Sequence, residues 1–140
     1  MREKPYEFIE HTADIGIRVK GDSLKELFSN TALAMFEIIA ERKNPAGTNL
    51  KSIKIKQQAE NLDELFINWL NELLSLSAAR GLIFSDFKIE ALDDKNLEAS
   101  VVGENTSNFK VNTEIKAATY HQLKLEERDG GWMAEIIFDV

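Results

Sequence analysis

Apolar and polar residues alternate in several short segments of the chain, a spacing that predicts β-strands with one buried face. The segments with this alternation are 15–20, 51–56, 87–91, 97–101, 111–117, 123–125 and 132–140. In the last of them, the even-numbered residues from Trp132 to Val140 share one face and the odd-numbered residues from Met133 to Asp139 share the other. The even-numbered face is wholly apolar, whereas the other face includes Glu135 and Asp139.

Two longer segments carry apolar residues at helical spacing instead. The first is predicted to be a helix over 23–42, and it begins with Ser23 followed three residues later by Glu26, the signature of a capping box. The second begins at Asn61, carries one leucine-rich apolar stripe, and ends before Gly81, a residue that favours the left-handed conformation found just after helices.

The order of these elements indicates the fold class. Both helices precede a long run of strands, and Asp93-Asp94 and Asp129-Gly130-Gly131 are hairpin turn signals between consecutive strands. We therefore expect an α+β fold in which two helices pack on a largely antiparallel β-sheet sandwich. At 140 residues, the chain fits a single domain spanning 1–140.

Composition excludes several classes of function. The chain has no cysteine, which rules out disulfides, thiolate zinc sites and thiol nucleophiles. Its 17 basic and 24 acidic residues give a net charge of −7, which disfavours direct binding to a phosphate backbone. No apolar run is long enough to span a membrane and no signal peptide is evident, so we expect a cytoplasmic protein with no membrane partner.

Carboxylates at the two ends of the chain suggest a metal site. Asp139 lies one residue from the terminal carboxylate of Val140, and Asp14 directly precedes a predicted strand. If these strands pair, three anionic groups converge, and a bound cation relieves their repulsion. Such hard oxygen ligands favour calcium, magnesium or manganese. The ordinary alternatives are a turn-forming role for Asp14 and a solvated strand end for Asp139.

Other polar residues allow different chemistry. Glu10, His11 and Thr12 precede Asp14 and resemble the equipment of a general base. However, the chain contains no nucleophile elbow, phosphate-binding loop or HExxH motif. His11 could equally be a partly buried structural histidine. Lys116 lies on the polar face of the predicted 111–117 strand, where a solvated lysine is the ordinary interpretation.

The segment Phe8-Ile9-Glu10-His11-Thr12-Ala13-Asp14-Ile15-Gly16 resembles the opening motif of the archease family. Three later segments resemble the same family: Glu114-Ile115-Lys116-Ala117-Ala118-Thr119-Tyr120-His121, Gly130-Gly131-Trp132 and Ile137-Phe138-Asp139-Val140. The length, acidic balance and order of elements also match, so the resemblance covers essentially the whole chain.

This resemblance implies an accessory protein for an RtcB-type RNA ligase, which joins tRNA halves during tRNA splicing. That ligase depends on manganese and uses GTP to guanylylate its own histidine. The accessory protein promotes guanylylation and multiple turnover, is not itself a ligase, and meets tRNA only through its partner. The family metal site, usually assigned to calcium, falls here on Asp14, Asp139 and the main-chain carboxylate of Val140. Lys116 matches a family lysine tied to activation.

Two other functions compete with ligase activation. A stand-alone metal-dependent hydrolase would use Glu10 or His11 as a base on metal-bound water. In the favoured function, Glu10, His11 and Thr12 are instead candidates to surround and support the metal ligands. A general chaperone would need a large exposed apolar patch, and the patterning shows no surplus of apolar residues. The identity of the metal, among calcium, manganese and magnesium, and the oligomeric state stay open at this point.

Overall fold

The computed structural model describes residues 4–9, 14–45 and 49–140, and it has the expected α+β architecture. Its elements are β1 (Tyr6–Ile9), β2 (Ile15–Gly21), α1 (Leu24–Ile39), β3 (Ala40–Arg42), β4 (Lys51–Gln58), α2 (Leu62–Arg80), β5 (Leu82–Leu92), β6 (Asn96–Asn105), a short 3-10 helix (Thr106–Asn108), β7 (Phe109–Val111), β8 (Ala117–Arg128) and β9 (Gly131–Asp139). Neither α1 nor α2, within this described part, has the length and apolarity that crossing a membrane requires.

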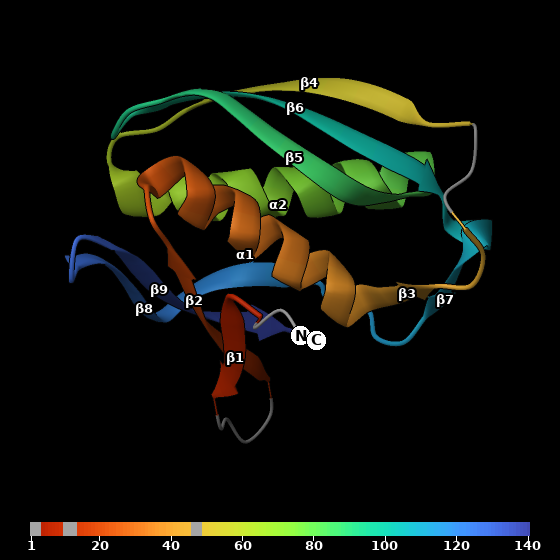
Figure 1. Cartoon of the computed structure of the whole chain (residues 1–140), viewed down its shortest axis with the longest axis horizontal. Coiled ribbons are helices and arrows are strands. Elements are labelled where there is room, and N and C mark those ends of the chain that lie inside the picture. The colour runs from red at the N-terminus through yellow and green to blue at the C-terminus, as the bar shows by residue number, and fades with distance from the viewer. Residues whose placement is uncertain (1–3, 10–13, 46–48) are drawn as a thin grey trace.

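The two helices lie between two antiparallel sheets (Figure 1). One sheet has four strands in the order β1-β2-β9-β8, and the other has three in the order β4-β6-β5. A two-stranded ribbon of β3 and β7 closes one end. Both sheets therefore turn one apolar face toward the helices, and the sandwich is built as sheet, helix layer and sheet.

Local sequence signals fix the ends of the helices. The Ser23 hydroxyl accepts a hydrogen bond from the Glu26 amide at 3.1 Å, which confirms the predicted start of α1. Asn61 caps α2 in the same way, through the Glu64 amide at 2.9 Å. Gly81 follows α2 with φ of 64°, the left-handed conformation that glycine adopts without steric cost.

The predicted end of the first helix at Arg42 is wrong by three residues. Ala40 already has extended backbone angles, and Ala40 to Arg42 form β3, which pairs with β7. The Arg42 guanidinium forms an ion pair with the buried Glu104 carboxylate and lies 4.8 Å from the Phe109 ring centroid. These tertiary contacts hold residues 40–42 in an extended conformation. The helical periodicity of the sequence, taken alone, predicts that the helix continues through them.

The predicted strand over 111–117 is also wrong. β7 ends at Val111, β8 begins at Ala117, and the residues between them belong to no strand. Val111 is 55% exposed although the alternation placed it on a buried face. Ile115 is buried as expected. The alternation therefore identified one core residue, although the segment between β7 and β8 is not a strand.

The core fills the space between the sheets. The largest fully buried side chains come from both helices and both sheets, and they include Trp69, Phe28, Phe36, Phe66, Phe84 and Phe138. The indole N–H of Trp69 donates to the Phe28 carbonyl at 3.0 Å, so its buried polar atom is satisfied. The helices are thereby joined to each other as well as to the sheets.

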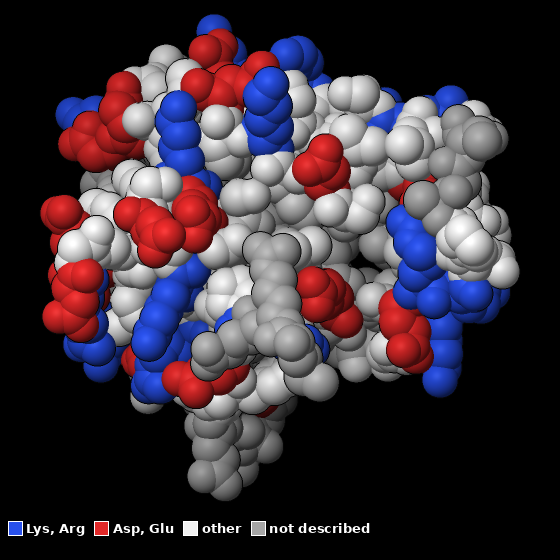
Figure 2. Space-filling model, in the orientation of Figure 1, with Lys and Arg blue, Asp and Glu red and all other residues white. Residues whose placement is uncertain are grey.

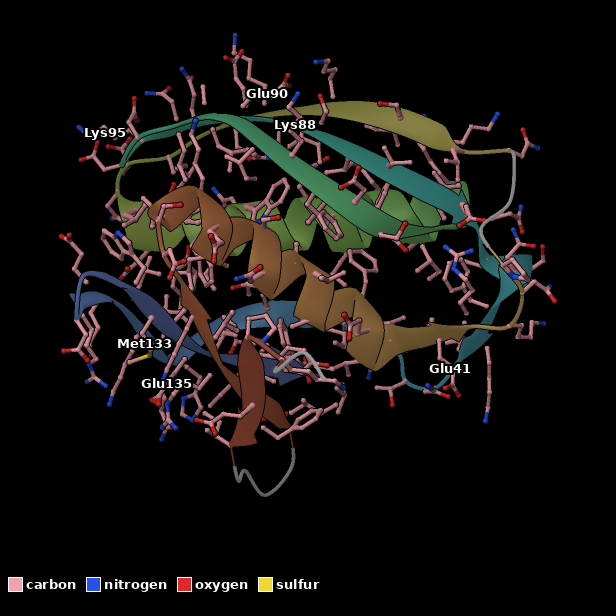
Figure 3. The ribbon with its side chains drawn as sticks, in the orientation of Figure 1. Glu41, Lys88, Glu90, Lys95, Met133 and Glu135 are labelled. Atoms are coloured by element: carbon pink, nitrogen blue, oxygen red, sulfur yellow. The ribbon has the colours of Figure 1, made fainter. Side chains whose placement is uncertain are left out.

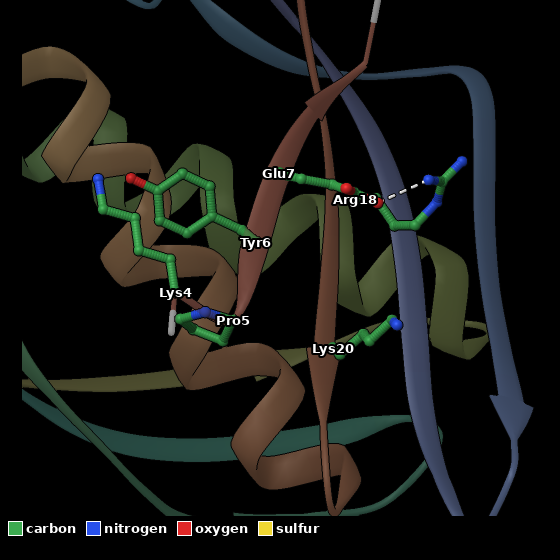
Figure 4. A pocket seen from close by; sticks show the side chains of 6 residues that line it. All are labelled: Lys4, Pro5, Tyr6, Glu7, Arg18 and Lys20. Atoms are coloured by element: carbon green, nitrogen blue, oxygen red, sulfur yellow. Dashed lines mark hydrogen bonds and ion pairs between the residues drawn. The ribbon is translucent and has the colours of Figure 1, made fainter. Parts of the chain in front are cut away.

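The outer face of the four-stranded sheet carries an ion-pair network. Arg18 of β2 donates to Glu7 of β1 at 2.7 Å and to Glu135 of β9 at 2.6 Å. Figure 4 shows the Glu7–Arg18 bond in the shallow pocket along β1, and Figure 3 shows Glu135 beside Met133 on the face turned away from the helices. The pKa of Glu135 is lower than its ordinary value of 4.5, mainly because its carboxylate accepts hydrogen bonds from Arg18.

We predict that Gly21→Ala destabilises the protein. An added Cβ at Gly21 would lie 2.5 Å from the Leu27 backbone nitrogen in α1, and backbone atoms cannot move aside as a flexible side chain can. The expected loss is about 2 kcal/mol of unfolding free energy, measured by urea denaturation. The control is Lys20→Ala, an exposed neighbour on the same strand, which should change stability by less than about 0.5 kcal/mol. Equal stability of the two variants would contradict the close packing of β2 on α1.

We also predict a pH-dependent contribution from Glu135. Its folded pKa is lowered, so its stabilising effect is present above the unfolded value of about 4.5 and is lost as pH falls through the folded pKa. Replacing Arg18 by Met should raise the Glu135 pKa, measured by NMR titration, and lower the unfolding free energy at pH 7. The stability difference from the parent should shrink below pH 4.5. Lys124→Met is the control, because its contact with Glu135 is longer, at 3.6 Å. A larger pKa change in that control would show that Arg18 is not the main cause.

Candidate functional site

One end of the four-stranded sheet brings together residues from three parts of the sequence. β9 is the strand between β2 and β8, and both neighbours run antiparallel to it. The starts of β2 and β8 therefore lie beside the end of β9. The last pairs at this end join Ile15 to Phe138 and Ala117 to Asp139.

Three of the residues predicted from sequence lie at this end of the sheet. Asp14 directly precedes Ile15, which pairs with Phe138, and Asp139 directly follows Phe138. Each aspartate is thus one residue beyond the same strand pair. Facing residues in antiparallel strands have Cα atoms roughly 5 Å apart, so continuing this register brings the two carboxyl groups to one locality. Val140 and its main-chain carboxylate follow immediately.

Lys116 is held at the same end by a backbone hydrogen bond. Its amide donates to the main-chain oxygen of Asp139 at 2.7 Å, one residue before the pairing of Ala117 with Asp139. The Lys116 side chain is exposed, as are Asp139 and Val140, whereas Asp14 is half-buried. We call Asp14, Lys116, Asp139 and Val140 the carboxylate end of the sheet.

The environment of the carboxylate end leaves its exposed acid available to a ligand. Within the residues that the structure describes, the Asp139 side chain takes part in no ion pair, and only its main-chain oxygen is engaged by Lys116. A neighbouring groove is lined by Lys116, Glu114 and Ile115 together with Asn71 and Ser75 of α2. The groove is open to solvent, and Lys116 is the residue of the carboxylate end that lines it.

The chemistry of these donors suits a hard divalent cation. Two aspartates and a terminal carboxylate offer only oxygen atoms, the ligands that calcium, magnesium and manganese prefer. No three His, Cys, Asp or Glu side chains in the described ranges lie close enough together to form a metal site. The predicted ligands are two aspartate side chains and one main-chain carboxylate, so they do not form a cluster of three such side chains. Asp14, Asp139 and Val140 as ligands remain a prediction.

The other residues singled out from sequence cannot be placed. Glu10, His11 and Thr12 lie outside the described residues. Sequence reasoning in turn missed Asn71, whose side-chain amide bonds both the Ala118 N–H at 2.8 Å and the Ala118 carbonyl at 3.2 Å. This asparagine holds the start of β8 against α2, and no motif in the sequence marks it for that role.

Comparison with known proteins identifies the family. The model of the Archease protein family (MTH1598/TM1083) matches residues 6–140. The chain is 41% identical to Protein archease of Pyrococcus furiosus, covering 98% of this chain and 99% of that protein. It is 34% identical to Protein archease of Methanosarcina barkeri, covering 98% of this chain and 97% of that protein.

Solved structures agree with these sequence relatives. The solution structure of protein 1598 of Methanobacterium thermoautotrophicum has a TM-score of 0.76 at 30% identity, covering 99% of this chain and all of that chain. The crystal structure of an archease from Thermotoga maritima, described as a possible chaperone, has a TM-score of 0.63 at 25% identity, with 100% and 98% covered. The family model, the sequence relatives and the solved structures lead to one conclusion: this chain belongs to the archease family.

Proposed function

We propose that this protein activates an RtcB-type RNA ligase by promoting guanylylation of the ligase and its multiple turnover. The observation that carries the proposal is the meeting of Asp14, Lys116, Asp139 and Val140 at one end of the four-stranded sheet. These are the positions at which the resemblance to archeases implies a metal site and an activating lysine. Membership of the family supports the same function.

A divalent cation would be held by Asp14, Asp139 and the main-chain carboxylate of Val140. When bound, such a cation supplies positive charge that offsets the repulsion among these anionic groups. The pairing of β9 with both neighbours supports the arrangement, because it fixes the final residues of the chain instead of leaving them as a loose tail. The lysine amide on the Asp139 carbonyl orients that last strand residue.

The carboxylate end would act at or beside the active site of the ligase. Its acidic side chains suit a site that contains manganese and a nucleotide, where they would help position the metal for attack of the ligase histidine on GTP. The exposed Lys116 ammonium would steady the nucleotide phosphates or an acidic residue of the ligase. The net charge of −7 favours action through the ligase over direct binding to RNA.

Two alternative functions have less support. A general chaperone needs a large exposed apolar patch, but the exposed large apolar side chains of the described residues come from separate segments: Phe8, Leu50, Val111, Tyr120 and Val140. A stand-alone hydrolase requires Glu10 or His11 as the base. That alternative predicts turnover of phosphoesters by the isolated protein with manganese, which an activity screen would reveal.

The main prediction concerns guanylylation of the cognate ligase in single-turnover assays with GTP and manganese. We expect Asp14→Ala, Asp139→Ala and Lys116→Ala each to reduce stimulation by about tenfold or more, since each removes a charged group from the carboxylate end. Asp94→Ala and Lys88→Ala are matched controls, because both are exposed and belong to the β5–β6 hairpin of the other sheet. Stimulation by all three variants equal to that of the parent would overturn the proposal.

Deletion of Val140 tests the metal site separately from the ligase. The deletion moves the terminal carboxylate onto Asp139 and shifts the site by one residue, so calcium or manganese binding measured by calorimetry should weaken about tenfold. Val140 is 39% exposed, so the melting temperature in metal-free buffer should change by less than about 2 °C. A large loss of stability without metal would show that Val140 serves mainly the core.

A further inference from the structure

A second groove lies at the opposite end of the four-stranded sheet from the carboxylate end. It runs between the first turn of α2 and the hairpin of β8 and β9, and its lining includes Asp63, Glu64, Tyr120, Leu125, Glu127 and Trp132. Trp132 pairs with Gly21 at one end of β9, whereas Phe138 pairs with Ile15 at the other. We call this feature the hairpin groove. It is separate from the site of the proposed ligase activation, and nothing in that proposal assigns it a role.

Aromatic and apolar side chains contribute much of this lining. Tyr120 is 55% exposed, and Trp132 and Leu125 are partly exposed. An exposed tyrosine and a partly exposed tryptophan facing one groove present ring faces that can pack on an incoming side chain. Such rings attract guanidinium and ammonium groups as well as apolar ones.

Four acids line the groove, and one of them, Glu126, is paired with Arg128 at 2.7 Å. Asp63, Glu64 and Glu127 take part in no ion pair among the described residues, whereas Glu135 and Glu104 elsewhere are paired with arginines. Figure 2 shows red side chains along the left end of the molecule, where α2 begins and the β8–β9 hairpin turns. The pKa of Tyr120 is raised, mainly by partial burial and secondly by the negative charges of Glu64 and Asp63. These two carboxylates therefore lie near the Tyr120 ring.

The backbone beside the groove is also open on one side. β8 is the outermost strand of its sheet, so only one of its edges pairs with a neighbouring strand. Asn71 covers the free edge at Ala118. From Leu123 to Glu127, described residues outside β9 make no hydrogen bond to the β8 backbone. An extended segment could bond to this free edge as an added strand.

We propose that the hairpin groove binds an extended segment of a partner protein that carries arginine or lysine residues. The unpaired acids supply charge complementarity, the rings of Tyr120 and Trp132 receive cationic or apolar side chains, and the free edge of β8 offers backbone hydrogen bonds. A nucleic acid would be repelled by the same acids. The proposal stands independently of ligase activation, because it concerns different residues at the other end of the sheet.

The test uses a blocked peptide of alternating arginine and valine, about eight residues long, the length of a typical edge-strand ligand. Binding is followed by tryptophan fluorescence, since Trp69 is fully buried and Trp132, the other tryptophan, lines the groove. We expect binding that weakens with added salt. A peptide in which glutamate replaces arginine should not bind.

Two triple variants with the same change in charge separate local from overall attraction. Asp63→Asn with Glu64→Gln and Glu127→Gln should weaken peptide binding about tenfold or more. The matched control is Asp86→Asn with Asp94→Asn and Glu98→Gln, which neutralises exposed acids of the three-stranded sheet and should change binding by less than about twofold.

Tyr120→Ala tests the aromatic part of the groove without a change in charge. It removes a side chain that is mostly exposed, so the fold should persist while peptide binding weakens about threefold or more. Equal binding by the two triple variants would overturn the proposal, because the attraction would then come from net charge alone. Failure of the parent protein to bind the peptide would also overturn it. Neither result would bear on ligase stimulation, which depends on the carboxylate end.

Discussion

The antiparallel pairing of β9 with β2 on one side and β8 on the other is the constraint on which the rest of the structure depends. It places the last residues of the chain beside the starts of two strands that are distant in sequence. Because β9 is an inner strand of its sheet and its helix-facing residues Ala134, Ile136 and Phe138 are fully buried, its register cannot slip without exposing the core. The position of Asp139 is therefore determined by packing.

Charge is distributed differently in the body of the sheet and at its two ends. In the body, Arg18 pairs with acids on both neighbouring strands, and thus links β1, β2 and β9 through their outer faces. At the ends, Asp139 on one side and Asp63, Glu64 and Glu127 on the other have no ion pair among the described residues. Acids at exposed positions without an ion pair add little to stability, and the two proposals above assign them to the binding of a cation or a basic partner.

The archease relative from Pyrococcus furiosus matches nearly the whole chain in sequence, and the two related structures share its fold over nearly their whole length. In this fold both helices turn their apolar faces to the core between the sheets, and α2 adds polar residues to the grooves beside the four-stranded sheet. Both proposed sites lie at that sheet. One uses the ends of the strands and the other uses the free edge of β8.

Local sequence signals determined most of the secondary structure. The helices begin and end at the expected caps, Ser23, Asn61 and Gly81. Caps depend on side-chain and backbone preferences that act within a few residues, so the sequence alone can show them. Alternation likewise predicted a strand over 132–140, close to the bounds of β9, because it too is a local pattern. The fold class followed from the order of these elements, and the residues of the carboxylate end were chosen from their chemistry and from the resemblance to archeases.

Only the tertiary structure decided which strands are neighbours and where the long-range contacts lie. The sequence could not show that Arg42 leaves the helix to meet Glu104, or that residues 112–116 form a connection instead of a strand, because both depend on partners far away in the chain. It likewise could not show that Tyr120 and Trp132 line one groove with the start of α2. Periodicity reports which face of a segment is apolar, whereas sheet order and register are set by how all the apolar faces pack together.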